Sequence, residues 1–313
     1  MMIESWLLIA FIAPFLWALV AVIDTYFVHG VYSDEYDGTV VSGLFQVFPW
    51  ILVLMGVIQF TFPGNEIAFL ALFAGGFFIT SFFCYFWALF VSNDTALMQT
   101  IWSLSIPAVP FFAWIILGEV LLPIHYIGIG IALFGVLLFH FDAKVKRIGF
   151  VKIALPMSAA VVFLSLSMVI GKKAYEFSDQ PDFWSIYLLF STGAVITSFL
   201  ILIIGRGRQS LVKLRHIGLI SKRYLVPFFL SEGLSLIATI ASQKAISLAP
   251  SVSYVVVIES LVPVFIMLIS LAIFSITMNM GKFNSDIYRE QFRGAPMKIL
   301  ATIFIAIGIY IVV

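Results

Sequence analysis

Charged residues are scarce in this chain of 313 residues. They make up 11% of it, whereas about a quarter of an ordinary soluble domain is charged. Hydrophobic residues make up 62%, and the mean hydropathy is +1.13. A water-soluble fold could not hide this much apolar surface, so most of the chain must be surrounded by lipid. The composition therefore excludes a soluble enzyme and a soluble binding module.

The chain is also poor in residues that hold metals or form cross-links. Its one cysteine, Cys84, lies in an apolar run, which excludes a disulfide within the chain and a metal site built from several cysteines. The four histidines show no metal-ligand spacing, and the sequence has no Gly-x-x-x-x-Gly-Lys-Ser/Thr motif for nucleotide phosphates. We therefore expect no metal, no cofactor, no nucleic-acid partner and no enzymatic activity.

Long apolar runs are what the sequence has in abundance. A helix needs about 20 residues to cross the hydrocarbon core of a bilayer, and ten runs of roughly this length occur. All are expected to be helical, because an open strand edge cannot face lipid. They cover residues 6–28, 41–60, 67–91, 96–117, 124–141, 153–172, 183–204, 224–246, 252–275 and 297–313. The sequence thus predicts an all-α, multi-pass integral membrane protein with ten transmembrane helices.

The ten spans fall into two groups of five. Pro107 in the fourth span and Pro263 in the ninth lie at similar positions, and Gly135 and Gly308 match in the fifth and tenth. We therefore expect two repeats, residues 1–142 and 143–313. Since five is an odd number, the repeats must insert with opposite orientations. Inverted repeats of this kind place a substrate site between the halves, near the middle of the membrane.

Basic residues are unevenly distributed over the loops. Fourteen of the 17 lysines and arginines lie in or beside the loops that follow odd-numbered spans: Lys144, Lys146, Arg147, Lys152, Arg206, Arg208, Lys213, Arg215, Lys222, Arg223, Lys282, Arg289, Arg293 and Lys298. Loops rich in lysine and arginine are usually cytoplasmic. Both termini are therefore expected on the opposite side, outside the cytoplasm.

Two carboxylates interrupt long apolar spans, Glu232 in the eighth span and Glu259 in the ninth. A charge at such a depth costs at least about 2.5–3.5 kcal/mol, and such residues usually face a bundle interior or a water-filled cavity. One interpretation is that they bind a cation or carry a proton. The other is that they make structural hydrogen bonds, with Ser235 and Thr239 near Glu232 and Ser260 beside Glu259 as partners.

A second group of polar side chains could line the same interior. Gln99, Trp102 and Ser103 lie at helical spacing on one face of the fourth span, opposite the ninth in the expected repeat. Gln46 of the second span is a similar candidate for substrate binding. For each of them, a hydrogen bond that packs two helices together is the alternative.

Three further residues are candidates for movement rather than binding. Pro107 and Pro263 leave backbone carbonyls free and permit a helix to bend, so they are candidate hinges. Asp24 lies near the end of the first span, beside Thr25 and Tyr26. It is a candidate gate residue, or else part of a polar cluster at the level of the lipid headgroups.

Several short motifs resemble a known family. Leu117-Gly118-Glu119 ends the fourth span, Ala249-Pro250-Ser251-Val252-Ser253 joins the eighth to the ninth, and Glu259-Ser260-Leu261-Val262-Pro263-Val264 lies within the ninth. With the two five-span halves, they resemble the EamA-type branch of the drug/metabolite transporter superfamily over nearly the whole chain. Members usually have both termini in the cytoplasm, which differs from the orientation expected from the charges.

The resemblance implies a secondary transporter, a permease that moves a small organic metabolite or drug-like solute by alternating access. It favours export from the cytoplasm of a bacterium, across its cytoplasmic membrane. Coupling to protons through Glu232 or Glu259 is one hypothesis for how such export is driven. Because carboxylates outnumber basic groups within the spans, the expected solute is cationic or zwitterionic. The alternatives are a flippase for lipids or lipid-linked sugars, a membrane enzyme that uses Glu232 and Glu259 as acid and base, and a sensor or assembly protein that transports nothing. Either a monomer or a homodimer is compatible with the sequence.

Overall fold

The computed structural model describes residues 5–31, 35–91, 98, 101–139, 147–177, 182–203, 222–279 and 295–313. Within these ranges the chain forms helices and connections, with no strand. Eight segments there are long and apolar enough to cross a membrane, so this is a multi-pass integral membrane protein. The helices are α1 (Ser5–Val31), α2 (Glu35–Phe45), α3 (Pro49–Leu54), α4 (Asn65–Val91), α6 (Ser105–Leu117), α7 (Pro123–Phe139), α8 (Arg147–Glu176), α9 (Phe183–Ile203), α11 (Lys222–Leu248), α12 (Val252–Glu259), α13 (Val262–Asn279) and α15 (Ala295–Val312).

The fourth and fifth predicted spans correspond to shorter helices than expected. In the described part of the chain α6 has 13 residues and α7 has 17. Part of the fourth predicted span lies outside the described residues. Gly118 ends α6 in a left-handed conformation (φ 71°), which glycine adopts without steric cost. Among the described residues, eight segments are long and apolar enough to span a membrane and two apolar helices are shorter, so ten spans stay a prediction.

The prediction of one continuous helix over residues 41–60 is wrong. Helix α2 ends at Phe45 and α3 begins at Pro49. Pro49 has no N–H to donate to the carbonyl of Phe45, which explains the interruption. Gly56, with φ 71°, follows the end of α3, and the chain is not helical again before Asn65. The candidate span at residues 35–54 is therefore two helices joined by a turn, and irregular chain follows it up to Asn65.

The ninth predicted span is also divided. A turn at Ser260 and Leu261 separates α12 from α13, and Pro263 lacks the N–H that would bond the carbonyl of Glu259. A turn at Ser103 precedes α6 in the same way, four residues before Pro107. Both candidate hinge prolines therefore stand in the first turn of a helix that follows a break.

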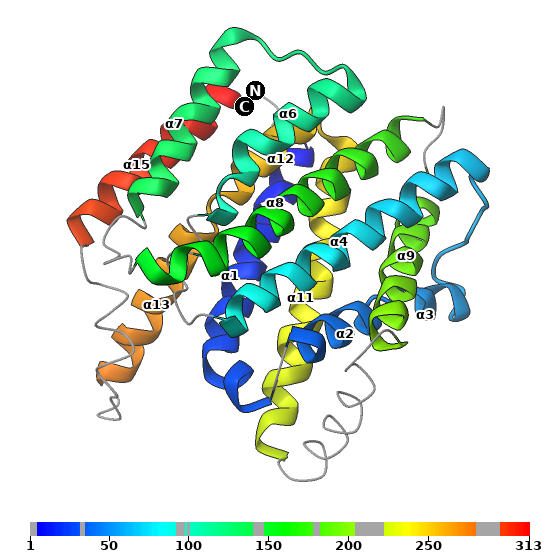
Figure 1. Cartoon of the computed structure of the whole chain (residues 1–313), viewed down its shortest axis with the longest axis horizontal. Coiled ribbons are helices and arrows are strands. Elements are labelled where there is room, and N and C mark those ends of the chain that lie inside the picture. Colours follow the sequence, from blue (N-terminus) through cyan, green and yellow to red (C-terminus); the bar gives the residue numbers. More distant parts are fainter. Residues whose placement is uncertain are drawn as a thin grey trace.

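Close helix crossings hold the bundle together (Figure 1). Helix α4 crosses α9 and α8, α1 packs along α11, and α7 pairs with α15. At the α4–α9 crossing the backbones touch: a Cβ on Gly75 would lie 1.8 Å from the carbonyl oxygen of Phe190, and one on Gly193 would lie 2.0 Å from that of Leu72. Only glycine fits at these two positions, because any side chain would force the helices apart.

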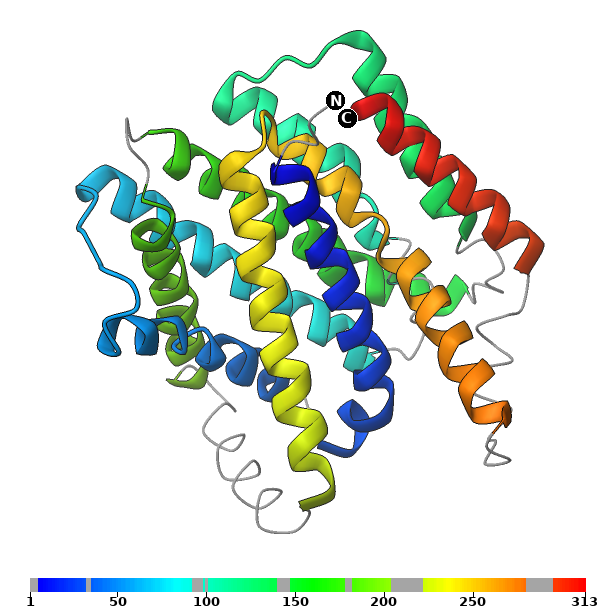
Figure 2. The same cartoon turned by 180° about the vertical axis from the view of Figure 1, so that it is seen from behind.

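The first turn of α1 and the end of α15 lie near each other at one end of the molecule (Figure 2). Figure 2 shows them close to the turn between α11 and α12 and to the connection between α6 and α7. We call this the terminal end, and define it by the α6–α7 connection (residues 118–122) and the α11–α12 turn (residues 249–251). Helices α8, α11 and α15 begin near the opposite end (Figure 1), and each directly follows a basic segment of the sequence. Which end faces the cytoplasm stays a prediction drawn from those charges.

Candidate functional site

Helix α11 carries polar side chains on several faces of an otherwise apolar segment. Ser231 donates a hydrogen bond to Asp24 of α1 at 2.6 Å, and Ser242 donates one to Glu259 of α12, also at 2.6 Å. The two serines are eleven residues apart, which is almost exactly three helical turns, so they share a face about 16 Å apart along the axis. Two carboxylates from different helices thus meet one face of α11 at different depths.

Glu232 brings a third carboxylate to α11. It is 7% exposed and accepts a hydrogen bond from Ser42 of α2 at 3.2 Å. Since it directly follows Ser231, it lies at nearly the same depth as Asp24. We call Asp24, Ser42, Ser231 and Glu232 the acidic cluster. It joins α1, α2 and α11, and it concentrates negative charge inside the bundle, where few polar groups can solvate it.

Aromatic rings adjoin the acidic cluster. Tyr85 of α4 lies within electrostatic range of Asp24, and the ring of Trp102 meets that of Tyr85 edge to face at 5.4 Å. Phe45 and Phe228 pack edge to face at 5.8 Å in the same apolar cluster. An organic cation would find both negative charge and ring faces in this region.

Glu259 forms a separate polar point, three turns of α11 closer to the terminal end. It is the last residue of α12, immediately before the break at Ser260. Its side chain is half-buried. No basic side chain of the described residues pairs with Glu259 or with Asp24. A carboxylate in this setting, held by one neutral hydroxyl, can exchange that hydroxyl for a cation or take up a proton.

Hydrogen bonds place the remaining predicted residues in different surroundings. Gln46 is buried against α9, where its side chain accepts from Tyr187 at 3.2 Å and its carbonyl accepts from Ser191. Ser103 is buried at the turn before α6, and its carbonyl accepts from Ile106. Gln99 lies outside the described residues. The structure thus brings Trp102 near the acidic cluster and directs Gln46 towards α9.

The serines that hold the carboxylates were missed by sequence reasoning. Thr239 donates instead to the backbone carbonyl of Ser235, and Ser260 to that of Val257, so these residues are not the partners of Glu232 and Glu259 that their proximity suggested. The three-turn spacing of Ser231 and Ser242 was the available signal. Ser42 had none, because it lies 190 residues from Glu232.

The described residues contain no group of three or more histidine, cysteine, aspartate or glutamate side chains arranged to hold a metal ion. No protein-family model and no curated protein matches the sequence. A solved structure, described only as the crystal structure of a protein, superposes with a TM-score of 0.67 at 16% sequence identity. The match covers 99% of this chain and 97% of that one. The likeness shows that nearly the whole chain shares its fold with that protein.

Proposed function

We propose that the protein is a secondary transporter of the drug/metabolite type, which moves a small cationic or zwitterionic organic solute across a bacterial cytoplasmic membrane. Its two five-helix halves would alternate between two arrangements around a central site. Asp24, Glu232 and Glu259 would bind the cationic group of the solute or carry a proton in exchange. The observation that carries the proposal is the placement of Asp24 and Glu259, half-buried among helices and hydrogen-bonded to serine.

The packing of the helices supports an inverted repeat. If α1 corresponds to α8, α4 to α11 and α6 to α12–α13, then the contact of α1 with α11 has its counterpart in that of α8 with α4. The contact of α1 with α13 likewise corresponds to that of α8 with α6. Apart from the close α4–α9 crossing, whose counterpart α11 with α2 is weak, three further contacts map onto themselves: α2 with α9, α6 with α12 and α7 with α15. This reciprocity is what a two-fold axis in the membrane plane requires.

The spacing of the carboxylates favours transport over a membrane enzyme. An acid and a base must reach the same substrate bond, but the serines that hold Asp24 and Glu259 are about 16 Å apart along α11. A solute that moves through the bundle, by contrast, can meet the two carboxylates one after the other. The positions of the carboxylates therefore fit successive binding sites along a transport path better than the single active site of an enzyme.

The experiment uses the full chain in liposomes that contain a pH-sensitive dye. Panels of cationic, zwitterionic and anionic solutes are added outside, and solute-dependent proton flux is recorded. We expect flux with a cation or a zwitterion and none with the anions. Glu259→Gln or Asp24→Asn should abolish it, because each removes a titratable carboxyl group and keeps an oxygen that can accept from the serine.

Glu66→Gln is the matched control, because Glu66 is an exposed carboxylate in the first turn of α4. It should leave the flux unchanged. Folding is checked by the thermal transition of each variant in detergent. Unchanged flux in both interior variants, or the absence of flux with every solute from folded protein, would sink the proposal.

A further inference from the structure

Two side-chain contacts at the terminal end link the first half of the chain to the second. Ser251, in the α11–α12 turn, donates to Glu119 of the α6–α7 connection at 2.6 Å. His125 of α7 and the hydroxyl of Tyr254 on α12 form a second hydrogen bond of 3.0 Å, and their rings meet edge to face. Both contacts join segments about 130 residues apart, so tertiary packing alone brings them together.

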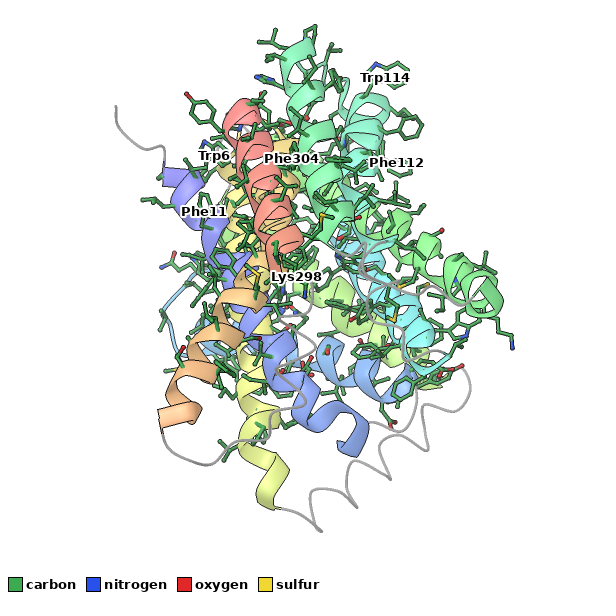
Figure 3. The ribbon with its side chains drawn as sticks, turned by 90° about the vertical axis from the view of Figure 1, so that its left-hand side faces the viewer. Trp6, Phe11, Phe112, Trp114, Lys298 and Phe304 are labelled. Atoms are coloured by element: carbon green, nitrogen blue, oxygen red, sulfur yellow. The ribbon has the colours of Figure 1, made fainter. Side chains whose placement is uncertain are left out.

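Further residues support these contacts from neighbouring helices. Lys172 of α8 is 4% exposed; it donates to the carbonyl of Ala249 at 2.6 Å and forms an ion pair with Glu176 at 3.1 Å. A cation at the carboxyl end of α11 satisfies a carbonyl that has no partner within the helix. From α1, the ring of Trp6, labelled in Figure 3, stacks on Tyr254. The α11–α12 turn is thus held from three sides.

The segments joined by these contacts are two short helices with breaks at their inner ends. Helix α6 runs from the turn at Ser103 to the terminal end, and α12 runs from the terminal end to the turn at Ser260. They pack against each other. Each can therefore move about its own break, while the bond between Glu119 and Ser251 ties their outer ends together.

The bond is not an optimal one for a permanent structural contact. Burial raises the pKa of Glu119, and Glu176 adds to this effect, whereas Ser251, Lys172 and the backbone N–H of Val252 act in the opposite direction. One of its carboxylate oxygens, Oε1, is buried without a hydrogen-bond partner. Leaving this buried oxygen without a hydrogen bond costs free energy, and water can donate to it once the contact opens. The unpaired oxygen therefore favours opening. The contact is thus closed but readily released.

We propose that Glu119 is a gate residue, whose bond to Ser251 holds α6 against α12 and closes the terminal end of the transport path. The contact between His125 and Tyr254 acts as the second fastening of the same gate. The inference rests on the proposed function, because a gate needs a path to close. Opening would separate α6 from α12 at this end, and the interior carboxylates would then be reached from that side.

A distance measurement tests the gate without any solute. In the full chain with Cys84→Ser, nitroxide labels are placed on cysteines at Val120 and Leu248, both exposed on opposite sides of the Glu119–Ser251 contact. Pulsed dipolar spectroscopy in liposomes then gives the distribution of distances. We expect one dominant distance in the otherwise unchanged chain. Glu119→Ala combined with Tyr254→Phe should add a second population at longer distance.

Two variants separate a gate from a merely structural contact. Glu119→Gln keeps an oxygen that can accept from Ser251 and should retain the short distance. Glu176→Gln changes a neighbouring carboxylate that does not cross between the halves, and it should do the same. An unchanged distribution in the double variant, measured on protein that retains its thermal transition, overturns the gate.

A flux measurement on the same variants distinguishes this inference from the proposed function. If the longer distance appears but solute-dependent flux is unaltered, Glu119 fastens the fold and is not a gate, so the inference fails while transport stands. If no variant, nor the wild type, shows flux, the transport proposal fails whatever the distances are. Support for the gate requires the longer population together with at least a several-fold change in flux.

Discussion

Among the described residues, Asp24, Glu259 and Glu119 each accept a hydrogen bond from a serine at 2.6 Å, but their surroundings differ. Asp24 and Glu259 meet Ser231 and Ser242 inside the bundle, whereas Glu119 meets Ser251 at the terminal end. Near Glu119, Lys172 favours the charged form of the carboxylate and Glu176 disfavours it. No basic side chain of the described residues offsets the negative charge of Asp24 or Glu259.

A hydrogen bond from serine to a carboxylate is thus suited to different purposes in these two places. At the terminal end water and Lys172 can compensate Glu119 when the bond opens, so the bond can act as a reversible fastening. In the interior the serine is a weak, neutral partner for a costly charge. A cation or a proton would compensate that charge better, which makes the interior sites suited to binding and the terminal one suited to closure.

Removing the serines should have the largest effect on stability, and the effect should differ between the interior and the terminal end. Ser242→Ala leaves Glu259 without its hydroxyl donor in the interior and should cost about 2 kcal/mol of unfolding free energy. Ser251→Ala should cost about 1 kcal/mol, mainly because Ser251 also caps α12 by accepting from the N–H of Ser253. Unfolding in mixed detergent measures both.

Ser275→Ala is the control for these variants, because its exposed hydroxyl bonds only the carbonyl of Leu271 in its own helix. It should change the unfolding free energy little. An equal or larger cost for Ser251→Ala than for Ser242→Ala would contradict the distinction between the interior and terminal sites.

Restoring a backbone N–H at the break between α12 and α13 should have a smaller effect on stability. Pro263→Ala gives α13 an N–H that can bond the carbonyl of Glu259, so α12 and α13 should join and stability should rise by up to about 1 kcal/mol. Flux should fall, because Glu259 then lies in a stiffer helix. Pro123→Ala is the control: it begins α7, where the N–H has no partner within the helix. A higher flux in Pro263→Ala would argue against a hinge.

The smallest effect concerns pH. The pKa of Glu119 is raised in the folded protein, so the folded state holds this proton more tightly than the unfolded state does. Its contribution to stability should therefore fall as pH rises from the ordinary carboxyl value of 4.5 through the folded value. The titratable groups that interact with Glu119 are Lys172 and Glu176 of α8 and Tyr254 of α12.

Glu119→Gln removes this dependence, because the amide does not titrate. The difference in thermal midpoint between Glu119→Gln and the wild type should grow in favour of the variant as pH rises over that range. The same pair of proteins compared at low pH provides the reference, since both are then neutral at this position. A difference that shrinks with rising pH would reverse the sign of the argument.

Sequence reasoning predicted the fold class and the burial of Glu232, but not the partners of the carboxylates. The prediction of a membrane protein follows from composition, and the breaks near Pro49 and Pro263 follow from missing backbone donors. The bond between Asp24 and Ser231 joins residues 207 positions apart. No local pattern encodes such a pair, because both residues are small and polar and could face any neighbouring helix.

Composition and the length of the apolar runs are enough to predict that this protein is embedded in a lipid bilayer, that its spans are helices, and that a few acidic residues lie inside them. The physical reason is that apolar length and the cost of unsatisfied backbone groups act locally, residue by residue. The partners of these acids, in contrast, are visible only in the folded chain: two serines of α11 donate to Asp24 and Glu259, and Ser251 meets Glu119 at the terminal end. Those pairings depend on how distant helices cross, at points such as Gly75 and Gly193 where the backbones touch.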